Sequence, residues 1–381
     1  MSMTHGRHGG GFARAAMREL PIAAGLATGA LALAHFSPQG APDSAASVAW
    51  SLWLVVAILG CAFRAMAHAD ALAERFGEPL GTLILTIAAI TIEVAAVCAV
   101  MLGQGGDETV ARDTMFSVLM IILNLLLVLA LLIGGMRRTE QEFNPQSAGA
   151  YLPLLVTLGM ITLVLPRFTR SAEGGWMSDP MMVFVGLASF VLYAVFLAMQ
   201  TTKHRAFFAH HGASERAHDA RPAHHDAGSP WKHGALLVVA LLAVIMVAEG
   251  MAGRVHALLD TLAVPSGIGG VFIALLVLAP EGMAALQSAR RDDMQRSINI
   301  LLGSALSTIG LTVPAVIAIH FITGASPEFG LDAPYIVLLV ATFMVAGLNL
   351  RGGRVNAIQG VVHLLIFVAW VVTILDEGAA R

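Results

Sequence analysis

The chain has 381 residues, of which 57% are hydrophobic and only 12% are charged, and its formal net charge is −3. Soluble domains carry about 25% charged residues, so this composition, with a mean hydropathy of +0.77, excludes a soluble domain and indicates a helical protein that crosses a membrane several times. The near-neutral charge gives no sign of a nucleic-acid partner, and neither of the two lysines, Lys203 and Lys232, follows a glycine-rich run, which excludes a P-loop for nucleotides.

The first apolar run covers residues 19–36, after a segment that carries Arg7, Arg14 and Arg18. A basic start, an apolar stretch and the small-residue segment APDSAAS that follows also describe a signal peptide. We favour a retained helix, with residues 1–46 forming a cytoplasmic tail and the first span. The topology of the remaining chain is the same in both cases.

Further apolar runs of spanning length follow, bounded by charged residues or by Pro and Gly. They cover residues 47–66, 79–102, 114–135, 149–166, 180–200, 233–252, 265–288, 297–322, 333–349 and 355–375. With eleven spans, most of the 22 basic residues fall on the side of the N-terminus. This bias predicts a cytoplasmic N-terminus and an outward C-terminus.

A polar segment at residues 201–232 divides the spans after the first into two sets of five, at 47–200 and 233–381. Because five is an odd number, the second set enters the membrane with the opposite sense, which predicts an inverted repeat. The segment is rich in histidine and alanine and contains Pro222 and Pro230. We interpret it as a flexible cytoplasmic linker, although histidines that titrate or bind metals leave a regulatory role open.

Two glutamates, Glu93 and Glu281, interrupt corresponding apolar runs, and each follows a glycine by twelve residues, Gly81 and Gly269. A charge at bilayer depth costs roughly 2.5 to 3.5 kcal/mol on insertion scales, so such an acid indicates an ion or proton path. The alternative is a carboxyl paired with a basic residue for helix association. No Lys or Arg lies at comparable depth in any expected span, which favours the functional reading.

The next span in each half opens with an arginine, Arg112 or Arg296, and aligning these sets Asn124 against Thr308. Ser304, Ser307 and Thr308 lie three and four residues apart and so share one flank of a helix. This stripe of oxygens suits ion binding, but small and hydroxyl residues also allow close helix packing. For any single one of them we favour packing.

Two carboxylates with nearby hydroxyl and amide oxygens suit a hard cation such as Ca²⁺. The same carboxylates also hold protons, and competition at one site is sufficient for antiport. Pro280 removes a helical N–H and frees the carbonyl of Leu276, so we expect an interrupted helix at Glu281. In the first half, Thr91 either supplies an oxygen or bonds its own backbone.

The stretches GEPLGTLILTIAAITIEVA with ARDTMFSVLMIILN, and LAPEGMAALQSARRDDMQRSINILLGSALSTIGLTVPAV, resemble the two alpha repeats of the cation/calcium exchanger superfamily. The resemblance is nearest to its bacterial calcium/proton antiporter branch. It implies an all-α polytopic membrane protein with one extra N-terminal helix and two inverted five-helix repeats. It also implies that Glu93 and Glu281 alternately bind protons and the cation, with Asn124, Ser304 and Ser307 at or near ligand positions.

Many members of that superfamily carry Gly-Asn shortly before the acid, where this chain has Ile90-Thr91 and Ala279-Pro280. The cation is therefore open among Ca²⁺, Na⁺ and K⁺. Members also carry acids on the helices before each repeat, and Asp70 and Glu249 are the matching candidates here. These two acids either form a gate or vestibule, or extend to the membrane interface.

Two histidines, His320 and His363, lie in or at the ends of apolar runs. They are candidates for proton relay, although a hydrogen-bonded interior histidine is the commoner case. Both cysteines, Cys61 and Cys98, fall in apolar runs and are expected to be buried small hydrophobic residues.

We expect a multi-pass transporter of a bacterial inner membrane that exports Ca²⁺ in exchange for H⁺ by alternating access at the two glutamates. The runner-up is a Na⁺ or K⁺/proton antiporter, and an ion channel is a further alternative. The chain contains no H-E-x-x-H or G-x-S-x-G motif, which argues against an intramembrane enzyme. No cofactor is expected beyond the transported ions, Ca²⁺ and H⁺, and a homo-oligomer is left open.

Overall fold

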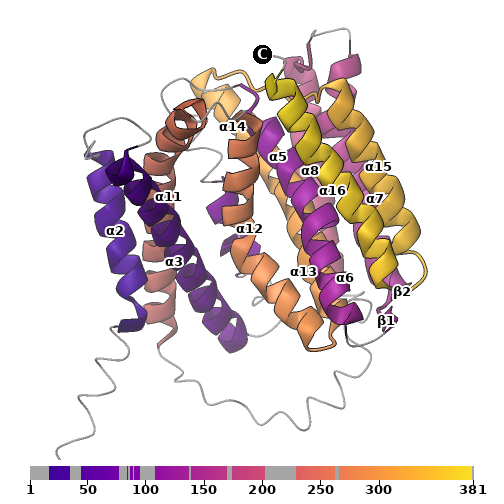
Figure 1. The fold of residues 1–381 in the computed structure, drawn as a ribbon, viewed down its shortest axis with the longest axis horizontal. Coiled ribbons are helices and arrows are strands. Elements are labelled where there is room, and N and C mark those ends of the chain that lie inside the picture. The colour runs from indigo at the N-terminus through magenta and orange to yellow at the C-terminus, as the bar shows by residue number, and fades with distance from the viewer. Residues whose placement is uncertain are drawn as a thin grey trace, which may run out of the picture.

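The computed structural model describes residues 17–34, 44–76, 84, 86–88, 90–94, 108–136, 139–169, 174–201, 229–261 and 266–379. It is a bundle of apolar helices (Figure 1). The first part of the chain forms α2 (Leu20–Leu33), α3 (Ala45–Phe76), α5 (Val110–Ile121), α6 (Leu127–Gly135), α7 (Pro145–Gly159) and α8 (Asp179–Thr201). The second part forms α11 (Pro230–Thr261), α12 (Ser266–Arg290), α13 (Met294–Ser307), α14 (Val313–Thr323), α15 (Ala333–Asn349) and α16 (Ala357–Ala379).

Short irregular segments join or extend several of these helices. The π-helical turns are η1 (Ile122–Leu126), η2 (Met160–Val164) and η4 (Thr308–Thr312), and η3 (Leu165–Phe168) is a 3₁₀ turn. Each π turn continues one rod, so α5, η1 and α6 form one span and α13, η4 and α14 form another. Two-residue strands β1 (Gln141–Glu142) and β2 (Arg354–Val355) pair in antiparallel fashion, with Gln141 opposite Val355.

The helices confirm the predicted fold class. Seven of the helical rods in the described part of the chain are long and apolar enough to cross a membrane, and Leu20–Leu33 and Ala333–Asn349 are shorter apolar helices. Every expected span coincides with a helix except 79–102, which is described only at residues 84, 86–88 and 90–94, all helical. The linker at 202–228 lies outside the described residues.

The packing of the two halves repeats with inverted order. The first helix of each half, α3 and α11, has 32 residues, and these two helices pack against each other. The last helix of each half packs on the split span of the other half, so that α8 contacts α14 and α16 contacts α6. The two halves therefore exchange their terminal helices across the bundle, as expected for an inverted repeat.

Polar contacts at the helix ends agree with the predicted alternation of sides. The pair β1 and β2 joins two loops that the topology places on the cytoplasmic side. At the same predicted side, Glu19 before α2 bonds Arg64 (2.6 Å) and His68 (3.0 Å) of α3, and His68 also bonds His233 of α11 (3.0 Å). The opposite end of the bundle carries a separate ion-pair cluster described below.

Two hydrophobic clusters divide the bundle. The smaller cluster joins α2, α3 and α11, with Ile92 and Leu276 contributed from the neighbouring helices, and the larger cluster holds the remaining helices. Figure 1 shows α2, α3 and α11 together at one side, with α12 between them and the rest. Inside the small cluster Gly25 packs directly against the buried Cys61, so any side chain at Gly25 would collide with the sulfur. Cys98 lies outside the described residues.

Candidate ion-binding site

Glu93 is held in the interior by a hydroxyl from the other half of the chain. It lies in the helical segment 90–94, and its side chain is only 5% exposed. Thr308, the first residue of η4, donates a hydrogen bond from Oγ1 to Glu93 Oε2 at 2.8 Å. The contact joins residues 215 apart in sequence, and it brings together two of the predicted site residues.

The Thr308 hydroxyl faces two acceptors at once. Its Oγ1 lies 2.8 Å from Glu93 Oε2 and 2.9 Å from the carbonyl oxygen of Ser304, one turn earlier on its own helix. A hydroxyl carries a single hydrogen and also accepts hydrogen bonds. It therefore donates either to a charged Glu93 or, when a protonated Glu93 donates to it, to the Ser304 carbonyl.

Glu281 brings a second carboxylate to the same region. It belongs to α12, in the second half, and it is close enough to Glu93 for the two carboxylates to interact electrostatically. Within the described part of the chain, Glu93 Oε1 and Glu281 Oε2 are buried atoms without a hydrogen-bond partner. Unpaired buried carboxylate oxygens are costly. Protons or a cation bound between them would remove this cost.

The helix that carries Glu281 differs from the prediction. We expected an interruption at Pro280, but α12 is continuous from Ser266 to Arg290, so this expectation is wrong. A proline lacks the N–H that would bond the Leu276 carbonyl, and one missing bond does not end a helix whose other bonds remain. Gly282 allows close packing here, since a Cβ at this position would lie 3.1 Å from Leu126 Cδ2 of η1.

The irregular backbone lies instead in the two spans beside the acids. Asn124 is inside η1 and Thr308 begins η4, and these are the positions that the arginine alignment matched. A π turn inserts one extra residue into a helix and is frequent at functional sites. The sequence alone does not predict either π turn. The only signal for them in the sequence is a polar residue at corresponding depth in each of the two apolar spans.

The side chain of Asn124, which the resemblance placed at or near a ligand position, forms hydrogen bonds with two helices of the second half. Its Nδ2 donates to Thr342 Oγ1 of α15 at 2.8 Å, and its Oδ1 lies 2.8 Å from Nδ1 of His363 on α16. All three side chains are fully buried. Asn124 thus joins the split span of the first half to two helices of the second half.

The remaining predicted oxygens mostly bond their own helices. The Ser307 hydroxyl donates to the Ser304 carbonyl at 2.9 Å, and the Thr91 hydroxyl donates to the Ile87 carbonyl at 2.7 Å, so Thr91 follows the backbone-bonding alternative. Ser304 is half-buried and places its carbonyl, described above, beside Thr308. No group of three or more His, Cys, Asp or Glu side chains able to hold a metal occurs among the described residues.

Only one of the two gate candidates, Asp70, has a described side chain. Asp70 is exposed near the end of α3 and interacts electrostatically with Arg296 and Glu74. Glu249 belongs to α11, and its side chain lies outside the described part of the structure. His320 is held at the end of α14, with Nδ1 2.7 Å from the Ala325 carbonyl oxygen.

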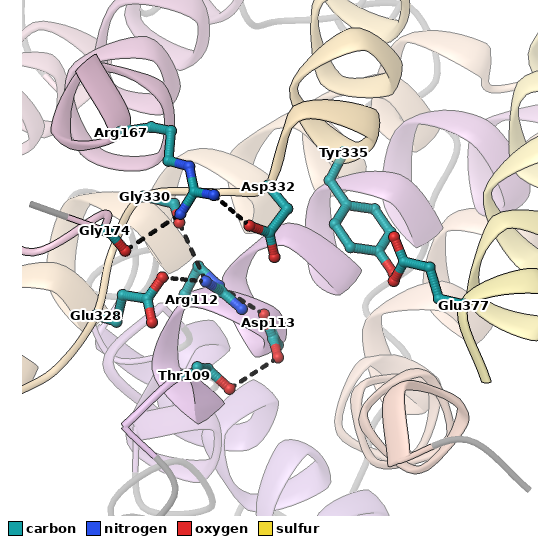
Figure 2. Close-up of polar contacts among 10 residues, drawn as sticks. All are labelled: Thr109, Arg112, Asp113, Arg167, Gly174, Glu328, Gly330, Asp332, Tyr335 and Glu377. Carbon is teal, nitrogen blue, oxygen red and sulfur yellow. Dashed lines mark hydrogen bonds and ion pairs between the residues drawn. The ribbon is translucent and has the colours of Figure 1, made fainter. Parts of the chain in front are cut away.

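A buried arginine organises the end of the bundle predicted to face outward (Figure 2). Arg112 donates to Asp113 Oδ1 at 2.8 Å, to Glu328 Oε1 at 2.7 Å and to the Gly330 carbonyl at 3.1 Å. Arg167 pairs with Asp332 at 2.9 Å in the same cluster. Burial raises the pKa of the Glu328 carboxyl, although the Arg112 guanidinium opposes this shift. The cluster fastens the first half to the segment between α14 and α15.

Comparison with known proteins agrees with this architecture. The family described as sodium/calcium exchanger protein matches residues 46–202 and 232–375. The putative ionic transporter y4hA of Sinorhizobium fredii is 38% identical over 344 residues, covering 90% of this chain and 91% of the relative. The sodium-potassium/proton antiporter ChaA of Escherichia coli is 36% identical over 331 residues, covering 86% and 89%.

The fold is also found among solved structures. The crystal structure of the calcium/proton antiporter YfkE is similar with a TM-score of 0.70 at 16% identity, covering 94% of this chain and 99% of that one. At this identity the similarity establishes a common fold. The inverted arrangement of the two halves is therefore shared with a membrane exchanger.

Proposed function

This chain belongs to the sodium/calcium exchanger family, and from that premise we propose that it exchanges Ca²⁺ for H⁺ at a site formed by Glu93 and Glu281. It is a multi-pass membrane transporter of a family of cation/proton antiporters, and not an enzyme. We place it in a bacterial inner membrane with a cytoplasmic N-terminus. Residues 47–200 and 233–381 form the two repeats, joined by the histidine-rich linker at 201–232.

One observation carries the proposal. Two carboxylates, one from each half, lie close enough to interact, and each has a buried oxygen without a partner in the described structure. Two adjacent carboxylates in a region of low dielectric require compensating positive charge. One Ca²⁺ supplies two positive charges, and two protons neutralise both acids. The same pair thus has two alternative neutral states.

Thr308 suits both states of Glu93. When Glu93 is charged, the Thr308 hydroxyl donates to it, and when Glu93 carries a proton, the hydroxyl accepts that proton's hydrogen bond and donates to the Ser304 carbonyl. A single rotation of one hydroxyl hydrogen therefore keeps the pair hydrogen-bonded in both states. This geometry allows proton and cation to alternate without leaving an unsatisfied donor.

The position of the two acids relative to the hydrophobic clusters indicates which parts of the bundle would move to expose the site. Glu281 lies on a helix that contacts both hydrophobic clusters, since Leu276 belongs to the small cluster while Ala274 and Leu278 belong to the large one, and Glu93 directly follows Ile92 of the small cluster. In carriers built from inverted repeats, one bundle rocks against another around a fixed site. We infer that the group α2, α3 and α11 moves against the remaining helices, and that the two acids stay between them.

A Na⁺ or K⁺/proton exchange is the second candidate, and two observations favour it. The relative at 36% identity is named as a sodium-potassium/proton antiporter. In addition, few oxygens surround the two acids in the described structure, because Ser307 and Asn124 bond elsewhere. Ca²⁺ takes six to eight oxygen ligands in proteins, so water would have to complete its shell.

Inverted membrane vesicles provide the test. The protein is produced in a strain without cation/proton antiport of its own, respiration acidifies the vesicle interior, and Ca²⁺, Na⁺ or K⁺ is then added outside. We expect Ca²⁺ to collapse the pH gradient, and Glu93→Gln and Glu281→Gln to abolish the response. Glu140→Gln, at an exposed loop acid, is the matched control and should keep it.

The outcomes separate the two parts of the proposal. A response to Na⁺ or K⁺ and none to Ca²⁺ would support the second candidate and reject Ca²⁺ as the cargo. Exchange that persists in both Gln variants would show that the site assignment is wrong.

A further inference from the structure

The outer surface of the bundle carries a groove of about 500 Å³ between α7, in the first half of the chain, and α15, in the second half. Figure 1 shows these two helices at the side of the bundle away from α2, α3 and α11, close to β1 and β2. The lining is mostly apolar, and its single charged residue is Arg351. An apolar groove on the surface of a membrane protein faces the lipid chains.

The groove exists because the facing sides of the two helices lack bulky side chains. On α7 the lining includes Pro145, Gly149, Pro153 and Thr157, which are exposed and share one face because they are four residues apart. On α15 it includes Gly347, and a Cβ at Gly149 or at Gly347 would meet nothing within 4 Å. Large apolar side chains occupy other exposed positions of α15, at Val337, Met344 and Leu348.

Close packing limits the groove at both ends. Toward the middle of the span, a Cβ at Gly159 of α7 would lie 2.9 Å from Phe343 Cζ of α15. At the other end, a Cβ at Gly353 would lie 3.0 Å from Pro145 Cδ. The lining of α7 extends from Pro145 to Thr157, which corresponds to about 18 Å of helix. One leaflet of the hydrocarbon core is about 15 Å deep, so the groove has the length of one acyl chain.

A cationic side chain lies at the end of the groove that the predicted topology places on the cytoplasmic side. Arg351 is exposed and follows the end of α15 by two residues. Its guanidinium forms no ion pair or hydrogen bond with any residue that the structure describes. Arg354, by contrast, pairs with Glu140 and Glu142. A guanidinium without a partner at the end of an apolar groove is complementary to a phosphate that carries hydrocarbon chains.

We propose that this groove binds one anionic phospholipid of the cytoplasmic leaflet, with an acyl chain along Gly149 and Gly347 and the phosphate at Arg351. Basic pockets between membrane helices on the cytoplasmic side are suited to anionic head groups, which are abundant in that leaflet. A free phosphate would leave the apolar length of the groove empty. The inference depends on the predicted topology and is independent of which ions bind at Glu93 and Glu281.

Native mass spectrometry of the purified full-length protein in detergent tests the charge preference. Phosphatidylglycerol and phosphatidylcholine with identical acyl chains are titrated separately, and the lipid retained per chain is counted. We expect one phosphatidylglycerol per chain, bound about fivefold more tightly than phosphatidylcholine, as one arginine at a membrane surface provides. Arg351→Gln should remove this preference. Arg354→Gln is the matched control and should keep it, because that guanidinium already pairs with two acids.

A second variant tests the groove itself. In Gly347→Leu the added side chain extends into open space, so the protein should fold with an unchanged midpoint of thermal unfolding. The leucine occupies the place of the acyl chain, and we expect the affinity for phosphatidylglycerol to fall about tenfold. Gly234→Leu on α11 is the matched control, since a Cβ there also meets nothing within 4 Å and lies outside the groove. It should retain the lipid.

Four results would overturn the inference. Equal weakening by Arg351→Gln and Arg354→Gln would show attraction to surface charge in general, and unchanged retention in Gly347→Leu would place the lipid elsewhere. Displacement of phosphatidylglycerol by excess inorganic phosphate would identify a site for free anions. A dimer that forms without added lipid and is lost in Gly347→Leu would identify a second copy of the chain as the occupant. The proposed ion exchange is measured separately, by the cation response in vesicles, and stands or fails on that result.

Discussion

At the scale of single residues, the chemistry of the site depends on which partners occupy each oxygen. Glu93 has a hydroxyl partner that serves it both charged and protonated, while the amide expected near Glu281 is occupied by two other helices. The two acids are thus related by fold symmetry but differ in their surroundings. If the proposed exchange is correct, we expect the two acids to bind protons and the cation with unequal strength.

Replacing Thr308 by Val removes the hydroxyl and keeps the shape of the side chain. Glu93 would then lose its hydrogen bond when charged, and bonds to charged groups contribute about 1.5 to 3 kcal/mol. We expect the half-saturating cation concentration in the vesicle assay to rise tenfold or more, roughly as this free energy requires. Thr308→Ser should retain exchange.

Ser307→Ala is the matched control for that substitution. Ser307 is the neighbouring residue, also buried, but its hydroxyl donates to its own helix at the Ser304 carbonyl. Its loss should leave the half-saturating concentration within about twofold. Equal effects of Thr308→Val and Ser307→Ala would contradict a specific role for Thr308.

The two acids could be selected from the sequence as candidate site residues, because a charged residue inside an apolar run is costly and therefore indicates a function. The direction of Asn124 was not accessible in this way. Its partners Thr342 and His363 lie 218 and 239 residues away, and only the folded bundle brings them together.

At the scale of elements, the lengths of the apolar runs predicted the membrane spans, but they did not predict the π turns η1 and η4 inside two of these spans or the continuity of α12. The π turns η1 and η4 contain the polar residues Asn124 and Thr308, but a polar residue in an apolar run does not by itself predict an inserted residue. Conversely, Pro280 predicted a break that the helix α12 does not show.

The Arg112 cluster predicts a strong effect on stability. The Arg112 side chain is 8% exposed and pairs with Glu328, which is 16% exposed, and with Asp113, which is 46% exposed, so Arg112→Gln leaves the largely buried Glu328 carboxylate without its Arg112 partner. Removing one partner of a buried pair costs about 3 to 5 kcal/mol. We expect a clearly lower midpoint of thermal unfolding for the purified protein in detergent.

Arg354→Gln provides the comparison at an exposed ion pair. Arg354, in β2, is 63% exposed and pairs with Glu142 of β1 and with Glu140, the residue before β1. Exposed pairs contribute about 0 to 1 kcal/mol, so its midpoint should change little. If Arg112→Gln were as mild as Arg354→Gln, the cluster would not fasten the two halves.

At the scale of the whole molecule, the inverted repeat was predictable from counting spans and basic loops. The separation into two hydrophobic clusters was not, because it depends on which helices share a packed core. The placement of Glu281 on a helix that touches both clusters, and of Glu93 beside a residue of the small cluster, emerges only in the folded bundle. That placement makes relative movement of the clusters the natural way to expose the site.

The predicted orientation can be checked by labelling single introduced cysteines. Asp179 and Glu140 are 74% and 54% exposed and lie at opposite ends of the bundle in the predicted topology. A bulky reagent that does not cross membranes should label Asp179→Cys in whole cells and Glu140→Cys only in inverted vesicles. Labelling of both positions from one side would refute the topology.

The central claim is that protons and the transported cation compete for one site made by Glu93 and Glu281. It is tested most directly by adding Ca²⁺ to the purified protein in weakly buffered detergent solution and measuring proton release. The account predicts release in the unchanged protein and in Glu140→Gln, and none in Glu93→Gln combined with Glu281→Gln. Ca²⁺ binding without proton release, or release that survives loss of both acids, would contradict it.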